Sequence, residues 1–216
     1  MIARPLLLSF AILLGLMVRP AHARDVQTAV VAGGCFWCVE ADFESVKGVI
    51  EVTSGYTGGR TADPTYYEVA RGRTGHYEAV RITYDADTVS LAQLYHLFFR
   101  AVDPLDAGGQ FCDRGAAYRT AIFVDGDEER MIATRAKQAA REALGRRIVT
   151  RILPQGPFYE AEENHQDYYK SDRLTVRGLL PTSRARAYAY YRKACGRDDR
   201  VQELWGDEAP FVRADP

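Results

Sequence analysis

The residue of this 216-residue chain best suited to chemistry is a cysteine at the start of an expected helix. Cys35 follows Gly33-Gly34 and precedes Phe36-Trp37. Backbone N–H groups and the positive end of a helix dipole stabilise a thiolate, which lowers the thiol pKa from its reference of about 8.5. The glycines allow a sharp turn that leaves the sulfur uncovered, and the aromatic rings form an apolar wall beside it. We therefore expect Cys35 to be a nucleophile with a lowered pKa.

A second cysteine, Cys38, completes a C-x-x-C motif with Cys35. Such motifs occur in thiol oxidoreductases and in half of a zinc site. A zinc site needs two further ligands at compatible spacing, whereas Cys112 and Cys195 are isolated and have no histidine pair nearby. We therefore expect no metal site. An even number of cysteines also fits structural disulfides in an exported protein, and burial of Cys35 for structural reasons is a further alternative.

A carboxylate in an alternating segment is the candidate proton donor. Glu78 lies on the same side of this expected strand as Val80 and Ile82. If that side faces the core, desolvation raises the pKa of the carboxyl group and keeps a proton available for general acid catalysis. If it faces solvent, Glu78 is an ordinary surface charge. The periodicity favours neither reading.

Several other polar and aromatic residues lie in expected loops or at the ends of elements, where functional groups concentrate. They are Tyr66, Asp113, Tyr118, His165 and Tyr168. Taken singly, each is more often structural than catalytic. The chain has neither a G-x-S-x-G elbow nor a Walker A loop, the motifs of serine hydrolases and of P-loop nucleotide-binding proteins.

The elements that must position these residues alternate in type. Apolar periodicity and capping residues predict strands over 29–32, 49–55, 76–84, 119–124 and 148–153, and helices over 37–46, 90–98, 127–144 and near 182–194. The order through Val124 is β-α-β-β-α-β, which is typical of a ferredoxin-like split βαβ sheet with helices on one face. The predicted fold class is α+β. Beyond Pro154 we expect a long, irregular C-terminal segment that wraps the same domain.

The first 23 residues are typical of a signal peptide. Arg4 precedes an apolar run from Leu6 to Val18, and Ala21-His22-Ala23 suits a cleavage site. The run is shorter than the about 20 residues that a membrane-spanning helix needs. We therefore expect export to the periplasm or secretion, a single catalytic domain over residues 24–216, and no stable membrane association after cleavage. A formal net charge of −1 with scattered basic residues argues against nucleic-acid binding.

Five blocks in the chain resemble those of the A-type methionine sulfoxide reductases, also called peptide-methionine (S)-S-oxide reductases. The blocks are Gly34-Cys35-Phe36-Trp37; Gly55-Tyr56, Gly58-Gly59 and Pro64-Thr65-Tyr66; Gly75-His76-Tyr77-Glu78-Ala79-Val80; Asp113-Arg114-Gly115 with Tyr118-Arg119; and Phe158-Tyr159, Glu162 and His165-Gln166. They follow the family's order across most of the chain. The resemblance implies reduction of the S epimer of methionine sulfoxide, free or in proteins, as repair after oxidative damage.

The resemblance also implies roles for the candidate residues. Cys35 would attack the sulfoxide sulfur and become a sulfenic acid, while Glu78 protonates the sulfoxide oxygen. Tyr66 and Tyr118 would donate hydrogen bonds to that oxygen as charge develops on it. The remaining family site residues would hold the substrate methyl group or position water and side chains; they are Phe36, Trp37, Asp113, His165 and Tyr168. No cofactor is implied.

The sulfenic acid must then be cleared by a second thiol. Cys195 resembles the resolving cysteine of many family members, and Cys38 is the next candidate, with Cys112 also able to compete. A thioredoxin or thioredoxin-like protein would reduce the resulting disulfide. Two other classes remain open from the residues alone: a disulfide oxidoreductase that uses Cys35 and Cys38 directly, and a noncatalytic exported binding module.

Overall fold

The computed structural model of the protein describes residues 24–177 and 180–212. The predicted signal peptide, residues 1–23, lies outside the described residues. Within the described ranges, no helix is both long and apolar enough to cross a membrane.

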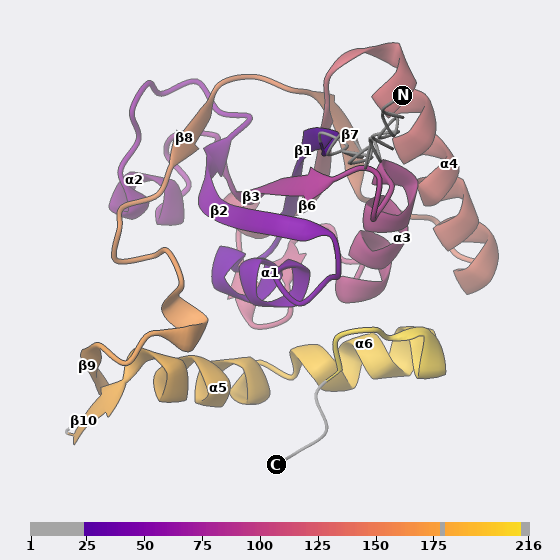
Figure 1. The fold of residues 1–216 in the computed structure, drawn as a ribbon. Helices are drawn as coiled ribbons and strands as arrows, with labels where there is room; N and C mark the ends of the chain where they lie inside the picture. Colours follow the sequence, from indigo (N-terminus) through magenta and orange to yellow (C-terminus); the bar gives the residue numbers. More distant parts are fainter. Residues whose placement is uncertain (1–23, 178–179, 213–216) are drawn as a thin grey trace, which may run out of the picture.

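A six-stranded sheet forms the centre of the molecule, with the strand order β7-β6-β1-β3-β2-β8 (Figure 1). The strands are β1 (Val26–Gly33), β2 (Val49–Thr57), β3 (Tyr77–Asp85), β6 (Thr120–Val124), β7 (Arg151–Pro154) and β8 (Phe158–Glu160). All neighbours pair antiparallel except β6 and β7, which are parallel. The α+β class is confirmed.

Helices cover one face of this sheet and continue beyond it. The helices are α1 (Phe36–Phe43), α2 (Tyr66–Ala70), α3 (Leu91–Ala101), α4 (Gly126–Leu144), α5 (Arg184–Ala194) and α6 (Arg197–Trp205). Helix α1 packs on β1, β2 and β3, while α4 packs against α3. Ser90 and Gln93 form a capping box at the start of α3, and Gly145 ends α4 in the left-handed conformation (φ 60°).

Both faces of the central strands are buried. On β1, Val31 belongs to the main core with Phe36 and Phe98, whereas Val30 and Phe123 belong to a smaller cluster on the opposite face. Successive side chains of a strand point to opposite faces, so a central strand covered on both sides is apolar throughout. Strand β1 is longer than the short apolar run predicted from the sequence, because its exposed first residues, Val26–Thr28, pair with the end of β3.

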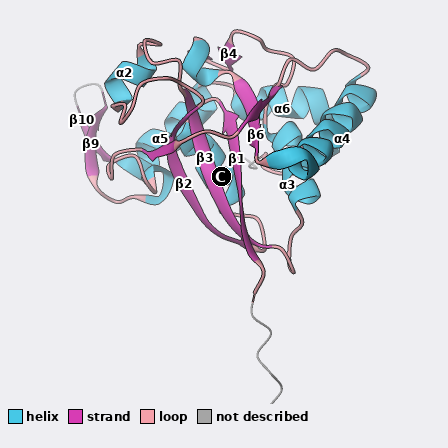
Figure 2. Ribbon diagram, turned by 90° about the horizontal axis from the view of Figure 1, so that it is seen from above, coloured by secondary structure: helices cyan, strands magenta, loops and turns pink. Residues whose placement is uncertain are grey.

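The segment beyond Pro154 has more regular structure than expected. It contributes β8 to the sheet, a hairpin of β9 (Leu174–Arg177) and β10 (Leu180–Ser183), and the helices α5 and α6. Figure 1 shows α5 and α6 running past α1, and Figure 2 places the hairpin beyond the β2 side of the sheet. Helix α5 begins at Arg184, later than predicted, because Ser183 caps it by accepting a hydrogen bond from the Arg186 N–H at 3.3 Å.

Candidate active site

Cys35 occupies the tight turn between β1 and α1. It is the N-cap residue of α1, and the preceding Gly34 has φ +85°. A Cβ at Gly34 would lie 2.6 Å from the Cβ of Gln110, so this close approach requires glycine. The turn therefore fixes the position of the sulfur relative to the sheet.

The turn opens into a small cavity of about 70 Å³. Its lining residues are Cys35, Phe36, Trp37, Tyr66, Glu78, Asp113, Tyr118 and Tyr191. They come from the start of α1, from α2 and β3, from β5 (Asp113–Arg114), from the 3-10 helix η1 (Ala116–Tyr118) and from α5. The structure thus brings together seven residues singled out from the sequence, which lie far apart along the chain.

Glu78 faces the core, which decides between the two readings of its strand. Its exposed fraction is 2%, and Val80 and Ile82 are fully buried beside it. Burial raises the pKa of the carboxyl group to about 8, although an N–H group of Phe36 at 3.1 Å partly opposes this shift. At neutral pH Glu78 is mainly protonated and can act as an acid.

The electrostatics of the two neighbouring thiols differ from the sequence expectation. Burial, a hydrogen bond donated to Cys38, and the nearby acids Glu78 and Asp113 raise the pKa of Cys35 well above its ordinary value. The expected lowering of the Cys35 pKa at the helix N-terminus is wrong, because Cys35 is only 7% exposed and the Phe36 N–H donates to Glu78. The pKa of Cys38 is lowered by the Cys35 hydrogen bond, and the charges of Arg197 and Arg192 also lower it.

Two tyrosines line the cavity with Glu78, and the Tyr118 hydroxyl forms hydrogen bonds with Glu78 and with Tyr66. Burial raises the pKa of Tyr66 to about 12 and also raises the pKa of Tyr118, so both remain hydrogen-bond donors at neutral pH. Helix α2 is held in place by Glu162, which accepts hydrogen bonds from the Tyr66 N–H at 2.9 Å and from the Tyr56 hydroxyl at 2.8 Å. Glu162 therefore positions Tyr66 from outside the cavity.

A stack of aromatic rings supports the apolar wall. The rings of Trp37 and Tyr168 lie 3.8 Å apart at 8°, and His165 lies 4.3 Å from Tyr66 and 5.4 Å from Phe36 between ring centroids. Burial lowers the pKa of His165, which favours the neutral ring. His165 and Tyr168 pack behind the cavity-lining residues and are not part of the lining itself.

Asp113 and Tyr191, a residue not singled out from the sequence, complete the lining of the cavity. The Tyr191 hydroxyl donates a hydrogen bond to the Asp113 carboxylate, whose pKa burial raises. Tyr191 stands four residues before Cys195 and therefore lies on the same side of the C-terminal helix. That spacing is the one signal in the sequence that points to Tyr191.

The four cysteines form two pairs. Cys112 and Cys195 are joined by a disulfide with Cα atoms 4.9 Å apart, whereas Cys35 and Cys38 are free and buried. The expected Cys35–Cys195 pairing is therefore not the one present in this structure. The resolving role of Cys195 stays a prediction.

Two groups of side chains have the composition of a metal site in the described ranges. One contains Asp113 and the two disulfide-bonded cysteines. The other contains Glu40, Glu44 and Asp167, but the Lys170 ammonium lies 2.6 Å from Glu44 and 2.8 Å from Asp167. A bonded sulfur is a poor ligand, and in the second group the Lys170 ammonium already occupies two of the three carboxylates, so neither arrangement favours a metal ion.

Comparisons with known proteins agree with this geometry. A family model described as peptide methionine sulfoxide reductase matches residues 27–198. The chain is 46% identical to peptide methionine sulfoxide reductase MsrA 2 of Rhizobium meliloti over 89% of this chain and 90% of the relative. It is 50% identical to MsrA of Limosilactobacillus reuteri over 68% and 86% of the two chains.

Among solved structures, methionine sulfoxide reductase A of Corynebacterium diphtheriae is 31% identical, with a TM-score of 0.61 over 72% of this chain and 83% of that one. The reduced form of Mxr1 from Saccharomyces cerevisiae is 28% identical, with a TM-score of 0.63 over 66% and 83%. The chain belongs to the peptide methionine sulfoxide reductase family.

Proposed function

We propose that this protein reduces the S epimer of methionine sulfoxide to methionine, with Cys35 as the nucleophile and Glu78 as the proton donor. The observation that carries these residue roles is the buried, mainly neutral Glu78 in the same cavity as the Cys35 sulfur. Membership of the family supplies the reaction. The geometry of the cavity supports the assignment of each group.

The steps follow from the positions of the cavity groups. The substrate methyl group packs against Phe36 and Trp37, and Glu78 protonates the sulfoxide oxygen, which makes the sulfur electrophilic. The Cys35 thiol passes its proton to the Cys38 sulfur, to which it already donates a hydrogen bond, and attacks the substrate sulfur. The oxygen ends on Cys35 as a sulfenic acid, and methionine leaves.

The arrangement of donors and wall also favours one epimer. Tyr66 and Tyr118 remain protonated and stabilise the oxygen as negative charge develops on it. The Phe36 and Trp37 rings and these two tyrosines line the same cavity as Cys35. The mirror-image sulfoxide would direct its oxygen toward the wall or its methyl group toward the hydroxyls, and either placement leaves polar groups unpaired.

The reductant in this proposal is a thioredoxin or a thioredoxin-like dithiol protein. Every turnover consumes two electrons, which two thiols supply by forming a disulfide. A disulfide with an exposed half, at Cys112, is present for such a protein to reduce.

We further propose that the protein acts after export, with residues 1–23 as a cleaved signal peptide. The support is the short apolar run and the Ala21-His22-Ala23 sequence. In a bacterial host, fractionation should find a form that begins near Arg24 in the periplasm, and deletion of residues 2–23 should retain the protein in the cytoplasm. The intact chain in the membrane fraction would contradict cleavage.

The reaction is tested by a single turnover on peptides that carry separated S and R epimers of methionine sulfoxide, without added reductant. Methionine is expected from the S epimer alone, and Cys35→Ser should form none. Cys195→Ser is the matched cysteine variant and should still form methionine in this first turnover. No methionine from either epimer, together with exchange of a peptide disulfide, would instead favour a disulfide oxidoreductase.

A further inference from the structure

The four cysteines differ sharply in their exposure to solvent. Cys35 and Cys38 are 7% and 2% exposed, whereas Cys112 is an exposed residue and Cys195 is half-buried. A protein reductant must bring its own thiolate into contact with a disulfide sulfur. It can reach the Cys112–Cys195 bridge but not a disulfide between the two buried thiols.

The buried thiols are placed to react with each other. The Cys38 N–H donates to the Cys35 carbonyl at 3.1 Å, which brings the two residues into the first turn of α1, and the Cys35 thiol donates to the Cys38 sulfur. Residues three apart on a helix are neighbours on its surface, and disulfides form readily in C-x-x-C motifs at this position. Cys195, in contrast, is bonded to Cys112.

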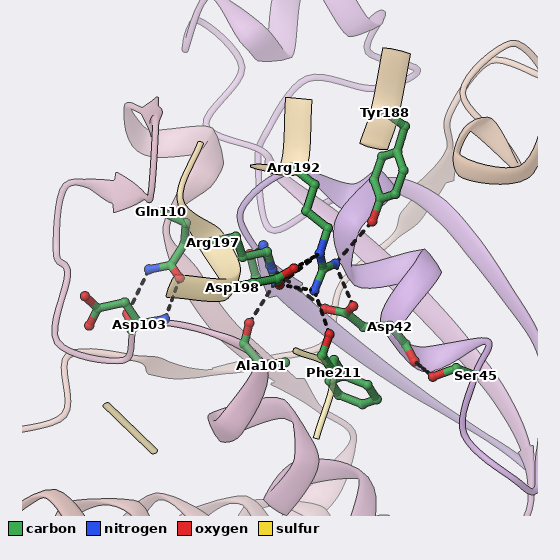
Figure 3. A network of polar contacts seen from close by, with 11 residues as sticks. Asp42, Ser45, Ala101, Asp103, Gln110, Tyr188, Arg192, Arg197, Asp198 and Phe211 are labelled. Atoms are coloured by element: carbon green, nitrogen blue, oxygen red, sulfur yellow. Dashed lines mark hydrogen bonds and ion pairs between the residues drawn. The ribbon is translucent and has the colours of Figure 1, made fainter. Parts of the chain in front are cut away.

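A network of charged side chains from the C-terminal helices surrounds Asp42 of α1 (Figure 3). Asp42, one turn after Cys38 on α1, accepts a hydrogen bond from Arg192 at 2.7 Å and lies 3.7 Å from the Arg197 guanidinium. Two guanidinium groups share this single buried carboxylate, although Asp198 also pairs with Arg192. The Cys35 hydrogen bond lowers the pKa of Cys38, and the charges of Arg197 and Arg192 lower it further, against the opposing effects of burial and Asp42. This shift favours the thiolate, which is the form that condenses with a sulfenic acid.

The exposed disulfide lies next to residues that line the cavity of Cys35. Asp113 lines the cavity with Cys35, and one of its carboxylate oxygens lies within 4.8 Å of the sulfurs of Cys112 and Cys195. Tyr191 also lines the cavity, and its carbonyl accepts the Cys195 N–H at 2.9 Å. Each half of the exposed disulfide therefore has a close neighbour in the active site: Asp113 for Cys112 and Tyr191 for Cys195.

We propose that electrons pass through two disulfides in series: Cys38 resolves the sulfenic acid of Cys35, and the Cys112–Cys195 pair connects the buried disulfide to an external dithiol protein. This inference rests on the proposed function.

In the first step of this relay, the Cys38 thiolate attacks the Cys35 sulfur, forms the Cys35–Cys38 disulfide and releases water after protonation of the leaving hydroxide. The reduced Cys112–Cys195 dithiol then attacks that disulfide, so two thiols return at Cys35 and Cys38 and the Cys112–Cys195 disulfide forms. An external dithiol finally reduces the exposed disulfide and becomes oxidised. The structure corresponds to the state before this last step, with the exposed pair oxidised and the buried pair reduced.

The first test counts methionine per chain. Protein reduced at all four cysteines and freed of reductant should form two methionines from an S-sulfoxide peptide and end with both disulfides. The Cys112→Ser/Cys195→Ser double variant should form one methionine and a Cys35–Cys38 disulfide. A yield of one from the reduced wild-type protein would overturn transfer between the pairs, whereas no methionine from any form would refute the proposed function itself.

The second test starts from the oxidised exposed pair, so that only Cys38 is available to resolve Cys35. After one turnover, mass mapping should find Cys35–Cys38. Cys38→Ser, which also lacks the sulfur that accepts the Cys35 proton, should form methionine more slowly and leave a Cys35 sulfenic acid that dimedone traps. A free Cys38 beside a trapped sulfenic acid in the wild-type protein would overturn the assignment of Cys38.

The third test compares two reductants in steady-state turnover. The rate with a bacterial thioredoxin, its reductase and NADPH is divided by the rate with dithiothreitol, a small dithiol that can enter the cavity. This ratio should fall at least tenfold in the Cys112→Ser/Cys195→Ser variant. An unchanged ratio would show that thioredoxin reduces the buried pair directly and would overturn the role of the exposed pair, even though methionine is formed.

Discussion

At the scale of single residues, the site depends on a carboxyl group that is protonated at a pH where exposed glutamates are ionised. Burial achieves this for Glu78, and the one N–H group of Phe36 that donates to it only partly restores the ionised form. The acid and the nucleophile are thus tuned by the same apolar surroundings, which raise both their pKa values.

The activity should therefore decline as the pH rises. The proton-donating form of Glu78 is lost as the pH passes its pKa of about 8. We expect the rate of methionine formation in a single turnover to fall above this pH, measured by rapid quench with the S-sulfoxide peptide. Glu78→Gln, which cannot supply the proton, should lower the rate by about 10²- to 10⁴-fold and remove this decline. Retention of the full rate by the glutamine variant would exclude Glu78 as the acid.

Glu78 should also make folding pH-dependent. Its pKa in the folded protein, about 8, is above the ordinary value of 4.5, so the folded state holds a proton that the unfolded state loses. The stability that this proton contributes is fully present below about pH 4.5 and is lost as the pH rises through about 8. Urea unfolding of Glu78→Gln between these pH values should show a smaller decrease in the free energy of unfolding than the wild-type protein. Equal slopes would contradict a buried neutral Glu78.

At the scale of elements, a carboxylate outside the cavity holds Tyr66, the first residue of the short helix α2. Glu162 accepts from the backbone of Tyr66 and from the hydroxyl of buried Tyr56. Glu162→Ala leaves both donors unpaired and should lower the free energy of unfolding by about 1–3 kcal/mol, with a slower single turnover because Tyr66 loses its position. Thermal and urea unfolding measure the first effect, and Glu163→Ala, at the exposed neighbouring residue, is the control. Equal effects of the two substitutions would show that Glu162 does not hold α2.

At the scale of the whole molecule, a buried ion pair joins a C-terminal helix to the first helix of the chain. Arg192 of α5 and Asp42 of α1 lie 2.7 Å apart and are almost fully buried. Arg192→Met leaves the Asp42 charge poorly compensated and should cost about 3–5 kcal/mol in the free energy of unfolding. Arg186→Met, on an exposed part of the same helix, should change it by less than about 0.5 kcal/mol. A small effect of both would show that Arg197 alone suffices for Asp42.

Much of this organisation can be predicted from the sequence, because local patterns encode it. Periodicity and caps locate the central strands and the longer helices, and the family blocks identify seven of the cavity-lining residues. The exposure of Glu78 could not be decided, since β3 is buried on both faces near the cavity and alternation then carries no information. The pKa of Cys35 was predicted in the wrong direction because the local helix argument ignores the acids and the burial that the fold adds.

Other features depend on contacts between distant segments. Strand β8 is only three residues long and forms by pairing with β2, which no local pattern indicates. The Cys112–Cys195 bridge spans 83 residues of sequence, and four cysteines allow three pairings. The positions of Tyr191, Arg192 and Arg197 likewise follow only after α5 is placed against α1.

The placement of α5 also has a consequence for the newly made chain. Cys35 and Cys38 pack against Tyr188 and Tyr191 of this helix, which is translated after the entire six-stranded sheet. Until α5 reaches α1, a nascent chain presents both reactive thiols to its surroundings without this cover. Delayed arrival of the helix in an oxidising compartment would permit non-native cysteine pairings, so the yield of correctly paired protein should depend on how fast the last part of the chain is delivered.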